Sequence, residues 1–258
     1  MKLDLQNKRV LITGASSGLG EHFSRVFARE GANLGLIARR EDRLKALADE
    51  LESEYGSKVA VASCDILNPV EIEQTMRDLH ARLGGIDILI NNAGVTKQAP
   101  AVEQTLEDWD QVVNTNLRGA WLCALAATKL MIADKTPESA PGNIINIASI
   151  LGLGASSQLA PYAISKAGVV QMTKVLALEW GHHGIRVNAL APGYFRTNMN
   201  TEFFESKAGQ KLISRLPQRR LGELAELDGP LLLLASDDAS FMTGIVIPVD
   251  GGHMVSSL

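Results

Sequence analysis

Seven short apolar runs, separated by segments of helical periodicity, constrain the fold of this chain more than any other feature of its sequence. The runs span residues 10–12, 34–37, 59–62, 86–90, 144–147, 185–190 and 245–249. Their apolar residues occupy consecutive positions, which is typical of strands covered on both faces. Between the runs, apolar residues recur at helical spacing, as Leu44, Leu47 and Leu51 do. This alternation predicts an α/β fold, with a parallel sheet between two layers of helices.

The size and composition of the chain fit one domain of this kind. It has 258 residues, of which 46% are hydrophobic and 21% charged, enough for a core of ordinary size. No linker, repeat or low-complexity segment interrupts the alternation, so we expect a single domain over residues 1–258. Residues 194–215 fall outside the strand–helix pattern and are predicted to form a lid over the substrate.

Charge and cysteine content exclude several other classes of protein. A net charge of −4 without a basic run disfavours nucleic-acid binding. Residues 1–9 lack the apolar core of a signal peptide, and no apolar run approaches the length of a membrane span. Two isolated cysteines favour a reducing compartment, so a cytoplasmic protein is expected. No metal site is expected, because neither the cysteines nor the histidines form a ligand cluster: Cys64, Cys123, His22, His80, His182, His183 and His253.

The first strand leads into a glycine-rich turn, TGASSGLG at residues 13–20, and a helical pattern follows at once. Glycines allow a tight turn and a close approach of pyrophosphate to the backbone, and the N-terminus of the next helix attracts the anion. The alternative is a glycine-rich turn that binds nothing. The candidate cofactor contacts in this turn are Gly14, Ser16, Ser17, Gly18, Leu19 and Gly20.

The end of the second strand bears on the choice of cofactor. A carboxylate there would bind the ribose 2′-hydroxyl of NAD, whereas an arginine accepts the 2′-phosphate of NADP. This strand ends in Arg39 and Arg40, which favours NADP(H) and leaves NAD(H) possible. The alternative is a pair of solvated arginines, for which Glu41 and Asp42 are candidate partners.

Polar and small residues follow the third and fourth strands. Asp65 and Ile66 stand where the carboxyl edge of the sheet would meet an adenine, although Asp65 could equally cap the next helix. Asn92, Ala93 and Gly94 would leave room for a cofactor beside the fourth strand.

A candidate reactive group follows the fifth strand. Ser149 ends that strand, and Tyr162 and Lys166 lie four residues apart on a helix predicted to begin near Ala160, so they share one face. A lysine ammonium beside a phenol should lower the pKa of the phenol, and such a tyrosine can exchange a proton near neutral pH. A Tyr–Lys pair at this spacing can also be an ordinary pair of surface residues.

Taken together, these segments resemble the short-chain dehydrogenase/reductase family over nearly the whole chain. The matching motifs are TGASSGLG at 13–20, NNAG at 91–94, Asn116 within NTN, Ser149, YAISK at 162–166, APG at 191–193 and VDGG at 249–252. The resemblance implies a Rossmann-type doubly wound domain whose seven parallel strands follow the order 3-2-1-4-5-6-7. It also implies an oxidoreductase that moves a hydride between nicotinamide and a carbonyl or alcohol carbon.

The resemblance further implies a role for each catalytic residue. Tyr162 would be the general acid in reduction and the base in oxidation, and Ser149 would orient and polarise the substrate oxygen. Lys166 would hold the nicotinamide ribose and lower the pKa of the tyrosine. Asn116 would hold a water that links Lys166 to solvent.

The same resemblance extends to the cofactor, the substrate and the oligomer. Pro192, Gly193 and Phe195 would lie behind the nicotinamide, and Thr197 would reach its carboxamide or the phosphates. Apolar residues near the reactive group favour a largely apolar or acyl ketone: Leu151, Leu153, Tyr194, Met199 and Phe203. The alternatives are an NAD-dependent secondary alcohol or sugar dehydrogenase and a non-catalytic nucleotide-binding protein. The helix that carries Tyr162, apolar on more than one face, is expected to be buried, and the protein to be a homotetramer or homodimer.

Overall fold

A seven-stranded parallel sheet forms the centre of the molecule, for which a computed structural model describes residues 5–136, 142–196 and 201–255. The strand order is β3-β2-β1-β4-β5-β6-β7, as predicted. Between β1 and β4 the chain reverses its direction of travel across the sheet, which opens a crevice at the carboxyl ends of the strands. The strands are β1 (Arg9–Thr13), β2 (Asn33–Ala38), β3 (Val59–Ser63), β4 (Ile88–Asn91), β5 (Gly142–Ile147), β6 (Ile185–Pro192) and β7 (Val246–Val249).

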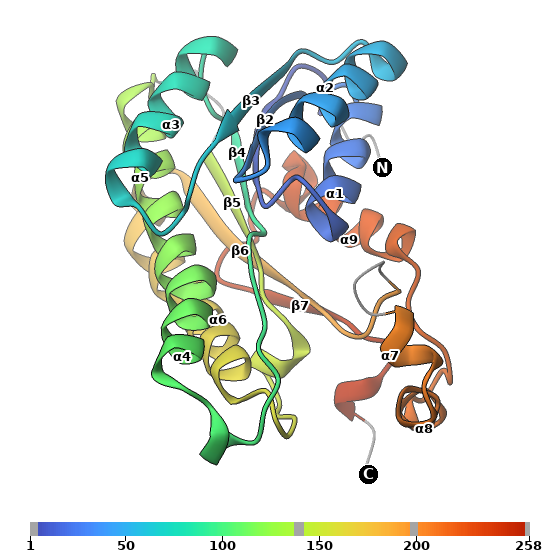
Figure 1. Ribbon diagram of the computed structural model, residues 1–258. Coiled ribbons are helices and arrows are strands. Elements are labelled where there is room, and N and C mark those ends of the chain that lie inside the picture. Colours follow the sequence, from blue (N-terminus) through green and yellow to red (C-terminus); the bar gives the residue numbers. More distant parts are fainter. Residues whose placement is uncertain (1–4, 137–141, 197–200, 256–258) are drawn as a thin grey trace.

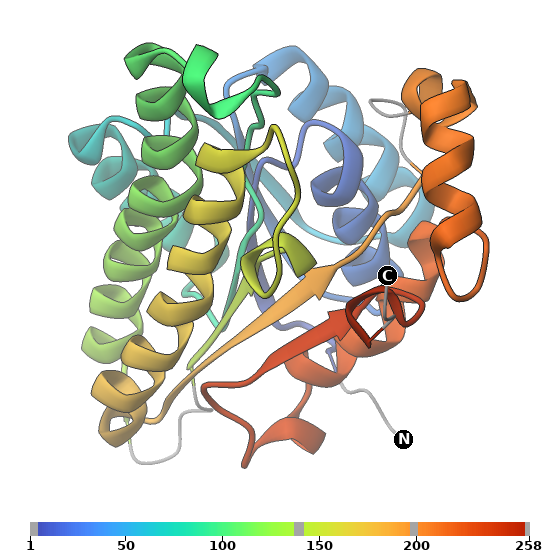
Figure 2. The same cartoon turned by 90° about the horizontal axis from the view of Figure 1, so that it is seen from below.

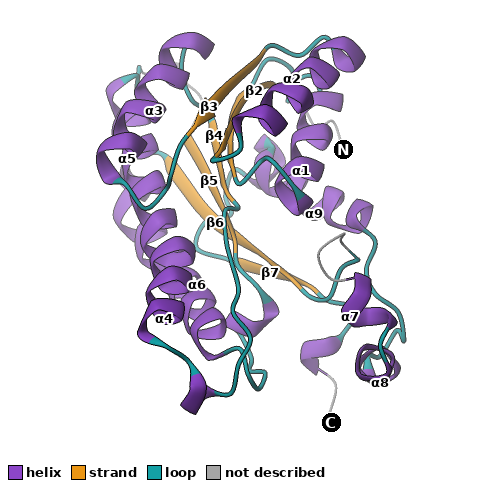
Figure 3. Cartoon of the chain, viewed as in Figure 1, coloured by secondary structure: helices purple, strands orange, loops and turns teal. Residues whose placement is uncertain are grey.

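Helices cover both faces of the sheet (Figure 1). Figure 3 shows the orange strands enclosed between the two purple layers. The layer on one face contains α3 (Pro69–Leu83), α4 (Leu106–Val113), α5 (Ala120–Ala133) and α6 (Ala160–Trp180). The other contains α1 (Gly18–Arg29), α2 (Glu41–Tyr55) and α9 (Asp228–Ala235). Among the described helices, none is long and apolar enough to cross a membrane.

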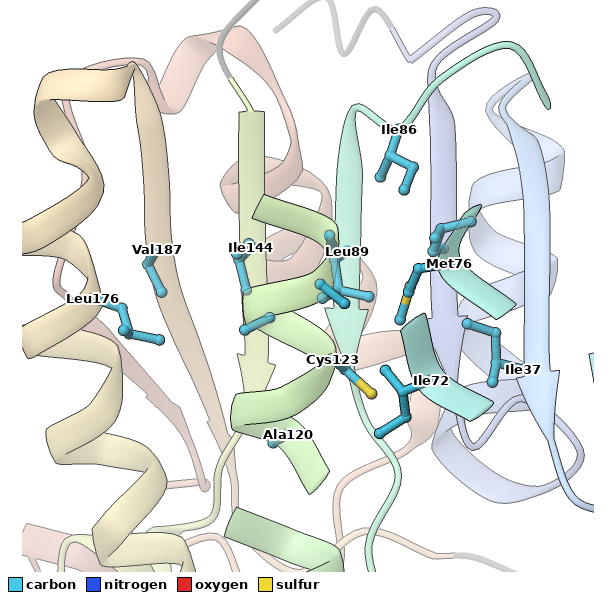
Figure 4. Close-up of a cluster of buried hydrophobic side chains, with 14 of the residues drawn as sticks. Ile37, Ile72, Met76, Ile86, Leu89, Ala120, Cys123, Ile144, Leu176 and Val187 are labelled. Atoms are coloured by element: carbon cyan, nitrogen blue, oxygen red, sulfur yellow. The ribbon is translucent and has the colours of Figure 1, made fainter. Parts of the chain in front are cut away.

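The strands are apolar on consecutive positions because each face packs against a different core. Leu11 belongs to the cluster beneath α3, α5 and α6, whereas its neighbours Val10 and Ile12 belong to the cluster beneath α1, α2 and α9. Figure 4 shows part of the first cluster, where Met76 and Cys123 converge on the sheet. Both faces of the sheet are therefore buried.

Local sequence signals explain where several helices begin and end. Asn68 caps α3, because its side chain accepts hydrogen bonds from the backbone N–H groups of Val70 and Glu71. Gly84 ends the same helix in the left-handed conformation. Helix α6 begins at Ala160, as predicted, but its N-cap residue Leu159 provides no side-chain hydrogen bond.

The described residues between β6 and α9 include two short helices, α7 (Thr201–Glu205) and α8 (Lys207–Arg215). A small apolar cluster of Phe204, Leu216 and Leu221 holds them together. Figure 2 shows them beside the C-terminal turn, near the carboxyl ends of β6 and β7.

Two predictions from apolar patterning were wrong. The fourth strand begins at Ile88 rather than Ile86. The backbone of Asp87 still pairs with Arg9 and Asn143, and its carboxylate accepts from the guanidinium of Arg9. Helix α6 is not buried on all sides either, since Val175 is 41% and Leu178 84% exposed. The apolar residues of α6 therefore divide between the core and the molecular surface.

Candidate active site

The glycine-rich turn between β1 and α1 is closely packed. Gly14 has a φ of +69°, and a Cβ on Gly20 would lie only 2.3 Å from the backbone oxygen of Gly14. Ser17 is the N-cap residue of α1, yet its side chain makes no capping hydrogen bond with the helix. The first turn of α1 therefore keeps the backbone donors and positive dipole that suit a phosphate.

Arg40 spans the gap between the end of β2 and this turn. Its guanidinium donates to the hydroxyl of Ser16, at 2.9 and 3.2 Å, and to that of Ser17, at 2.7 Å. Glu41, a partner considered from the sequence, pairs with Lys45 instead, at 2.7 Å. Among the described residues, no carboxylate forms an ion pair with Arg39 or Arg40, so this corner keeps its positive charge.

The loop after β4 is held against β1 by a residue that the sequence reasoning did not single out. The hydroxyl of Thr13 accepts hydrogen bonds from the backbone N–H groups of Asn92, at 3.0 Å, and Ala93, at 3.1 Å. The side-chain amide of Asn92 in turn donates to the Thr13 carbonyl at 2.9 Å. The sequence did contain a signal for this role, because Thr13 is a polar residue at the end of an otherwise apolar strand. This bracing keeps Gly94 close to the catalytic helix.

Asp65 and Ile66 lie at the carboxyl end of β3. One carboxylate oxygen of Asp65 accepts from the backbone N–H of Leu67 at 3.1 Å, so this residue braces its own loop. Ile66 is buried against Gly119, which lies at the end of a π-helical turn spanning Asn114–Gly119. Both residues therefore stabilise the loop after β3. Their predicted contact with the adenine of a cofactor stays a prediction.

Ser149, Tyr162 and Lys166 come together at the carboxyl end of β5. The ammonium of Lys166 is 5.8 Å from the centre of the Tyr162 ring and donates to the backbone oxygen of Ile147 at 2.6 Å. The hydroxyl of Ser149 accepts from the Leu151 backbone at 3.1 Å and also interacts with the Tyr162 phenol. Sequence spacing and strand ends had predicted this grouping.

The predicted direction of the Tyr162 pKa shift was wrong for the protein without cofactor. Burial raises the pKa of Tyr162, and the hydrogen bond from Ser149 lowers it only in part. Lys166 does not offset the burial, because its hydrogen bond goes to the Ile147 carbonyl rather than to the phenol. Burial lowers the pKa of Lys166 itself to about 8. Desolvation thus moves both groups toward their neutral forms.

The π-helical turn places Asn116 beside the catalytic helix. Its amide donates to the Val95 carbonyl at 2.9 Å and to the Ser165 hydroxyl at 3.0 Å, and its side-chain oxygen accepts from the Val95 backbone at 2.8 Å. Both amide hydrogens are therefore committed to protein groups. A water held by this side chain could only donate to it.

The predicted substrate residues lie in three segments. Leu151 is buried in the turn Ile150–Gly152 that follows Ser149, Leu153 comes next and is 40% exposed, and Tyr194 follows β6. Tyr194 interacts electrostatically with Tyr162 and raises its pKa. Phe203 is 43% exposed and meets the ring of Phe204 edge-on. Met199 lies outside the described residues.

Neighbours of Tyr194 were missed from the sequence. Its hydroxyl bonds to Ser156, and its ring meets those of Phe204 and His253 edge-on, at centroid distances of 5.9 and 5.4 Å. Burial raises the pKa of Tyr194, and the Ser156 hydrogen bond opposes that rise. These residues are far apart in the sequence, so no local sequence pattern predicts their contacts.

The predicted nicotinamide contacts follow the end of β6. Pro192 is the last residue of that strand, and Gly193 packs so closely on Asp250 that a Cβ would lie 2.8 Å from its backbone. The Phe195 side chain is buried in the core beneath α9, against Gly222. Only the backbone of Phe195 thus remains to face a ligand. Thr197 lies outside the described residues.

Comparison with known proteins identifies the family of this chain. A family model for enoyl-(acyl carrier protein) reductase matches residues 14–254. The 3-oxoacyl-acyl-carrier-protein reductase of Thermotoga maritima is 38% identical over 97% of this chain and 99% of its own length. Gluconate 5-dehydrogenase of Gluconobacter oxydans is 36% identical over 98% of this chain and 96% of its own length.

A solved structure shares the same architecture. It comes from Beutenbergia cavernae, holds NADP at low occupancy and is provisionally named an NAD(P)-dependent gluconate 5-dehydrogenase. The TM-score is 0.91 and the identity 33%, over 99% of this chain and 100% of that one. The chain therefore belongs to the short-chain dehydrogenase/reductase family, as its motifs indicated.

Proposed function

We propose that the protein is an oxidoreductase that transfers a hydride between NADP(H) and a ketone or secondary alcohol. The observation that carries the cofactor assignment is Arg40, whose guanidinium lies on the hydroxyls of Ser16 and Ser17 without a carboxylate partner among the described residues. With Arg39 at the same strand end, this corner offers two cations and two hydroxyls to a 2′-phosphate. The NADP held by the Beutenbergia cavernae relative supports the same assignment.

The chemistry follows from the groups at the end of β5. NADP(H) supplies or accepts the hydride, and the protein must handle the accompanying proton. Tyr162 would give that proton to the substrate oxygen in reduction and take it in oxidation, while Ser149 holds the same oxygen. Lys166, fully buried beside Gly94, would hold the nicotinamide ribose and place positive charge near the phenol.

The surroundings of Tyr162 favour a substrate with a neutral, largely apolar or acyl portion. Leu151 and Leu153, which follow Ser149 in the chain, and Tyr194, which interacts with Tyr162, would provide apolar surface beside the reactive phenol. A cavity of about 220 Å³ next to Tyr194 contains Arg220, but Glu226 pairs with both of its terminal nitrogens at 2.7 Å. This cavity therefore offers no unpaired arginine to a substrate anion. The 3-oxoacyl-acyl-carrier-protein substrate in the name of the Thermotoga maritima relative fits this class.

A sugar or polyol substrate is the second candidate. The hydroxyl of Tyr194 and its partner Ser156 form a polar edge close to Tyr162. Gluconate 5-dehydrogenase and D-threitol dehydrogenase among the relatives act on such compounds, as their names state. Turnover of polyols with no turnover of apolar ketones would select this candidate over the first.

We further propose that the protein forms a homo-oligomer through α5 and α6. Trp121 on α5 is 42% exposed, and Ile164, Val175 and Leu178 on α6 are at least 41% exposed. Burying these side chains against a second copy would remove apolar area from water. Sedimentation equilibrium should give a mass of two or four chains, and a monomer mass would contradict this part of the proposal.

The test of the cofactor assignment is a binding titration with NADPH and NADH. Wild type should prefer NADPH, and Arg40→Ala should weaken NADPH binding by about tenfold or more, the effect of losing a charged hydrogen bond, without changing NADH binding. Arg77→Ala, on α3 and paired with Glu73, is the matched control and should change neither. Equal affinity for the two cofactors in wild type would contradict the assignment.

A further inference from the structure

The helix that carries Tyr162 begins with Pro161 in its first turn but without a side-chain cap. Tyr162 is the third residue of α6, and the N-cap residue Leu159 makes no side-chain capping hydrogen bond. The residue before it, Gln158, has a φ of +64°, an uncommon conformation for a residue with a side chain. First turns of this kind open readily, because their leading N–H groups have no partner within the helix. Something other than a cap must hold Tyr162 in place.

Ser165 provides a connection from this turn to the body of the protein. It has no exposed surface, and its hydroxyl donates to the backbone carbonyl of Tyr162 at 2.7 Å. The same hydroxyl accepts from the amide of Asn116 at 3.0 Å. Asn116 in turn bonds to the N–H and the carbonyl of Val95, next to Gly94 in the loop after β4. A continuous series of hydrogen bonds thus runs from that loop to the first turn of α6.

We propose that Ser165 is a positioning residue for the reaction described above, holding the first turn of α6, and with it Tyr162, against Asn116. The proposal rests on the proposed function. Its physical basis is that proton transfer requires Tyr162 within hydrogen-bonding distance of the substrate oxygen, and small displacements of a catalytic group are costly. Ser165 touches neither substrate nor cofactor and acts only through the tyrosine.

The chain contains a close structural match for Ser165 that lies away from the site. Thr173 is also on α6 and fully buried, and its hydroxyl donates to the helix carbonyl of Val169 at 2.8 Å. It also accepts from an asparagine amide, that of Asn146, at 2.9 Å. Eleven residues separate Thr173 from Tyr162, about 16 Å along a helix. Replacing either hydroxyl by alanine leaves one asparagine hydrogen without its partner, and Thr173→Ala also removes a buried methyl group, so its structural damage should be at least as large.

The experiment compares Ser165→Ala with Thr173→Ala in three measurements. Urea unfolding should show a loss of stability at least as large in Thr173→Ala as in Ser165→Ala. Amide hydrogen exchange at residues 163–167 should become faster only in Ser165→Ala. With NADPH and a ketone that the wild type reduces, kcat should fall by about tenfold or more only in Ser165→Ala, with KM changing less than about twofold.

The outcomes separate this proposal from the proposed function. A wild-type protein that turns over no ketone or alcohol would contradict the function, whereas hydrogen exchange would still report on the first turn of α6. An active wild type whose kcat falls equally in both variants would overturn the role of Ser165. Exchange at residues 163–167 that is unchanged in Ser165→Ala would overturn it as well.

Discussion

Lys166 gives the most quantitative prediction, because it carries a titratable group into the core. Burial lowers its pKa from the ordinary value of 10.5 to about 8. Below pH 8 the lysine is protonated in both the folded and the unfolded protein, so its effect on stability does not change with pH. Between pH 8 and 10.5 the unfolded chain still holds the proton that the folded protein has released, so the free energy of unfolding rises with pH.

The comparison with Lys166→Met isolates this contribution from every other titrating group. From pH 7 to pH 9.5, linkage with these two pKa values adds about 2 kcal/mol to the unfolding free energy of wild type relative to the variant. The variant lacks the hydrogen bond to Ile147 at both pH values. Its loss therefore lowers the unfolding free energy of the variant by a similar amount at pH 7 and pH 9.5 and leaves the pH-dependent difference mainly to the lysine. Lys166→Met should also lose activity, because no ammonium remains beside the phenol.

The assay is urea unfolding of both proteins without cofactor, at one protein concentration, since ligands and subunit association change apparent stability. Lys45→Met is the control, because Lys45 lies on the surface of α2. A difference between wild type and Lys166→Met that stays constant from pH 7 to pH 9.5 would refute the reasoning. It would mean that the buried amine keeps an ordinary pKa.

Three further predictions follow from single contacts. Ser149→Ala should shift the acid limb of the pH profile for alcohol oxidation to higher pH, because its hydrogen bond lowers the Tyr162 pKa; an unmoved limb would argue against this. Gly20→Ala should destabilise the protein by about 1–3 kcal/mol in urea unfolding, because its Cβ would collide with the Gly14 carbonyl, and wild-type stability would disprove the close packing. Asn68→Ala should cost about 1 kcal/mol through loss of the α3 cap, whereas an unchanged unfolding midpoint would show that water replaces the cap.

Features with a short-range cause were predictable from the sequence. Consecutive apolar positions predicted buried strands because both faces of the sheet are covered. The four-residue spacing of Tyr162 and Lys166 placed them on one face of α6, and the order of strand ends brought Ser149 to them. These inferences depend on periodicity and on the parallel topology alone.

Features that depend on contacts between distant segments were not predictable. The hydrogen bond from Asn116 to Ser165 joins segments 49 positions apart, and their motifs do not show that these two side chains meet. The raised pKa of Tyr162 results from burial, which the spacing of Tyr162 and Lys166 does not report. The exposed Val175 and Leu178 look like core residues in the sequence, since a single sequence does not distinguish a core face from an interface face.

The central claim is that Tyr162 transfers the proton in NADPH-dependent reduction of a ketone. The most direct test measures the oxidation of NADPH by its absorbance, with a panel of apolar ketones, acyl thioesters and keto-sugars as substrates. The proteins compared are wild type, Tyr162→Phe and the control Tyr55→Phe. The claim predicts turnover by wild type and Tyr55→Phe, and at least about a hundredfold loss of kcat in Tyr162→Phe with NADPH binding retained. Turnover by Tyr162→Phe at the wild-type rate would contradict it.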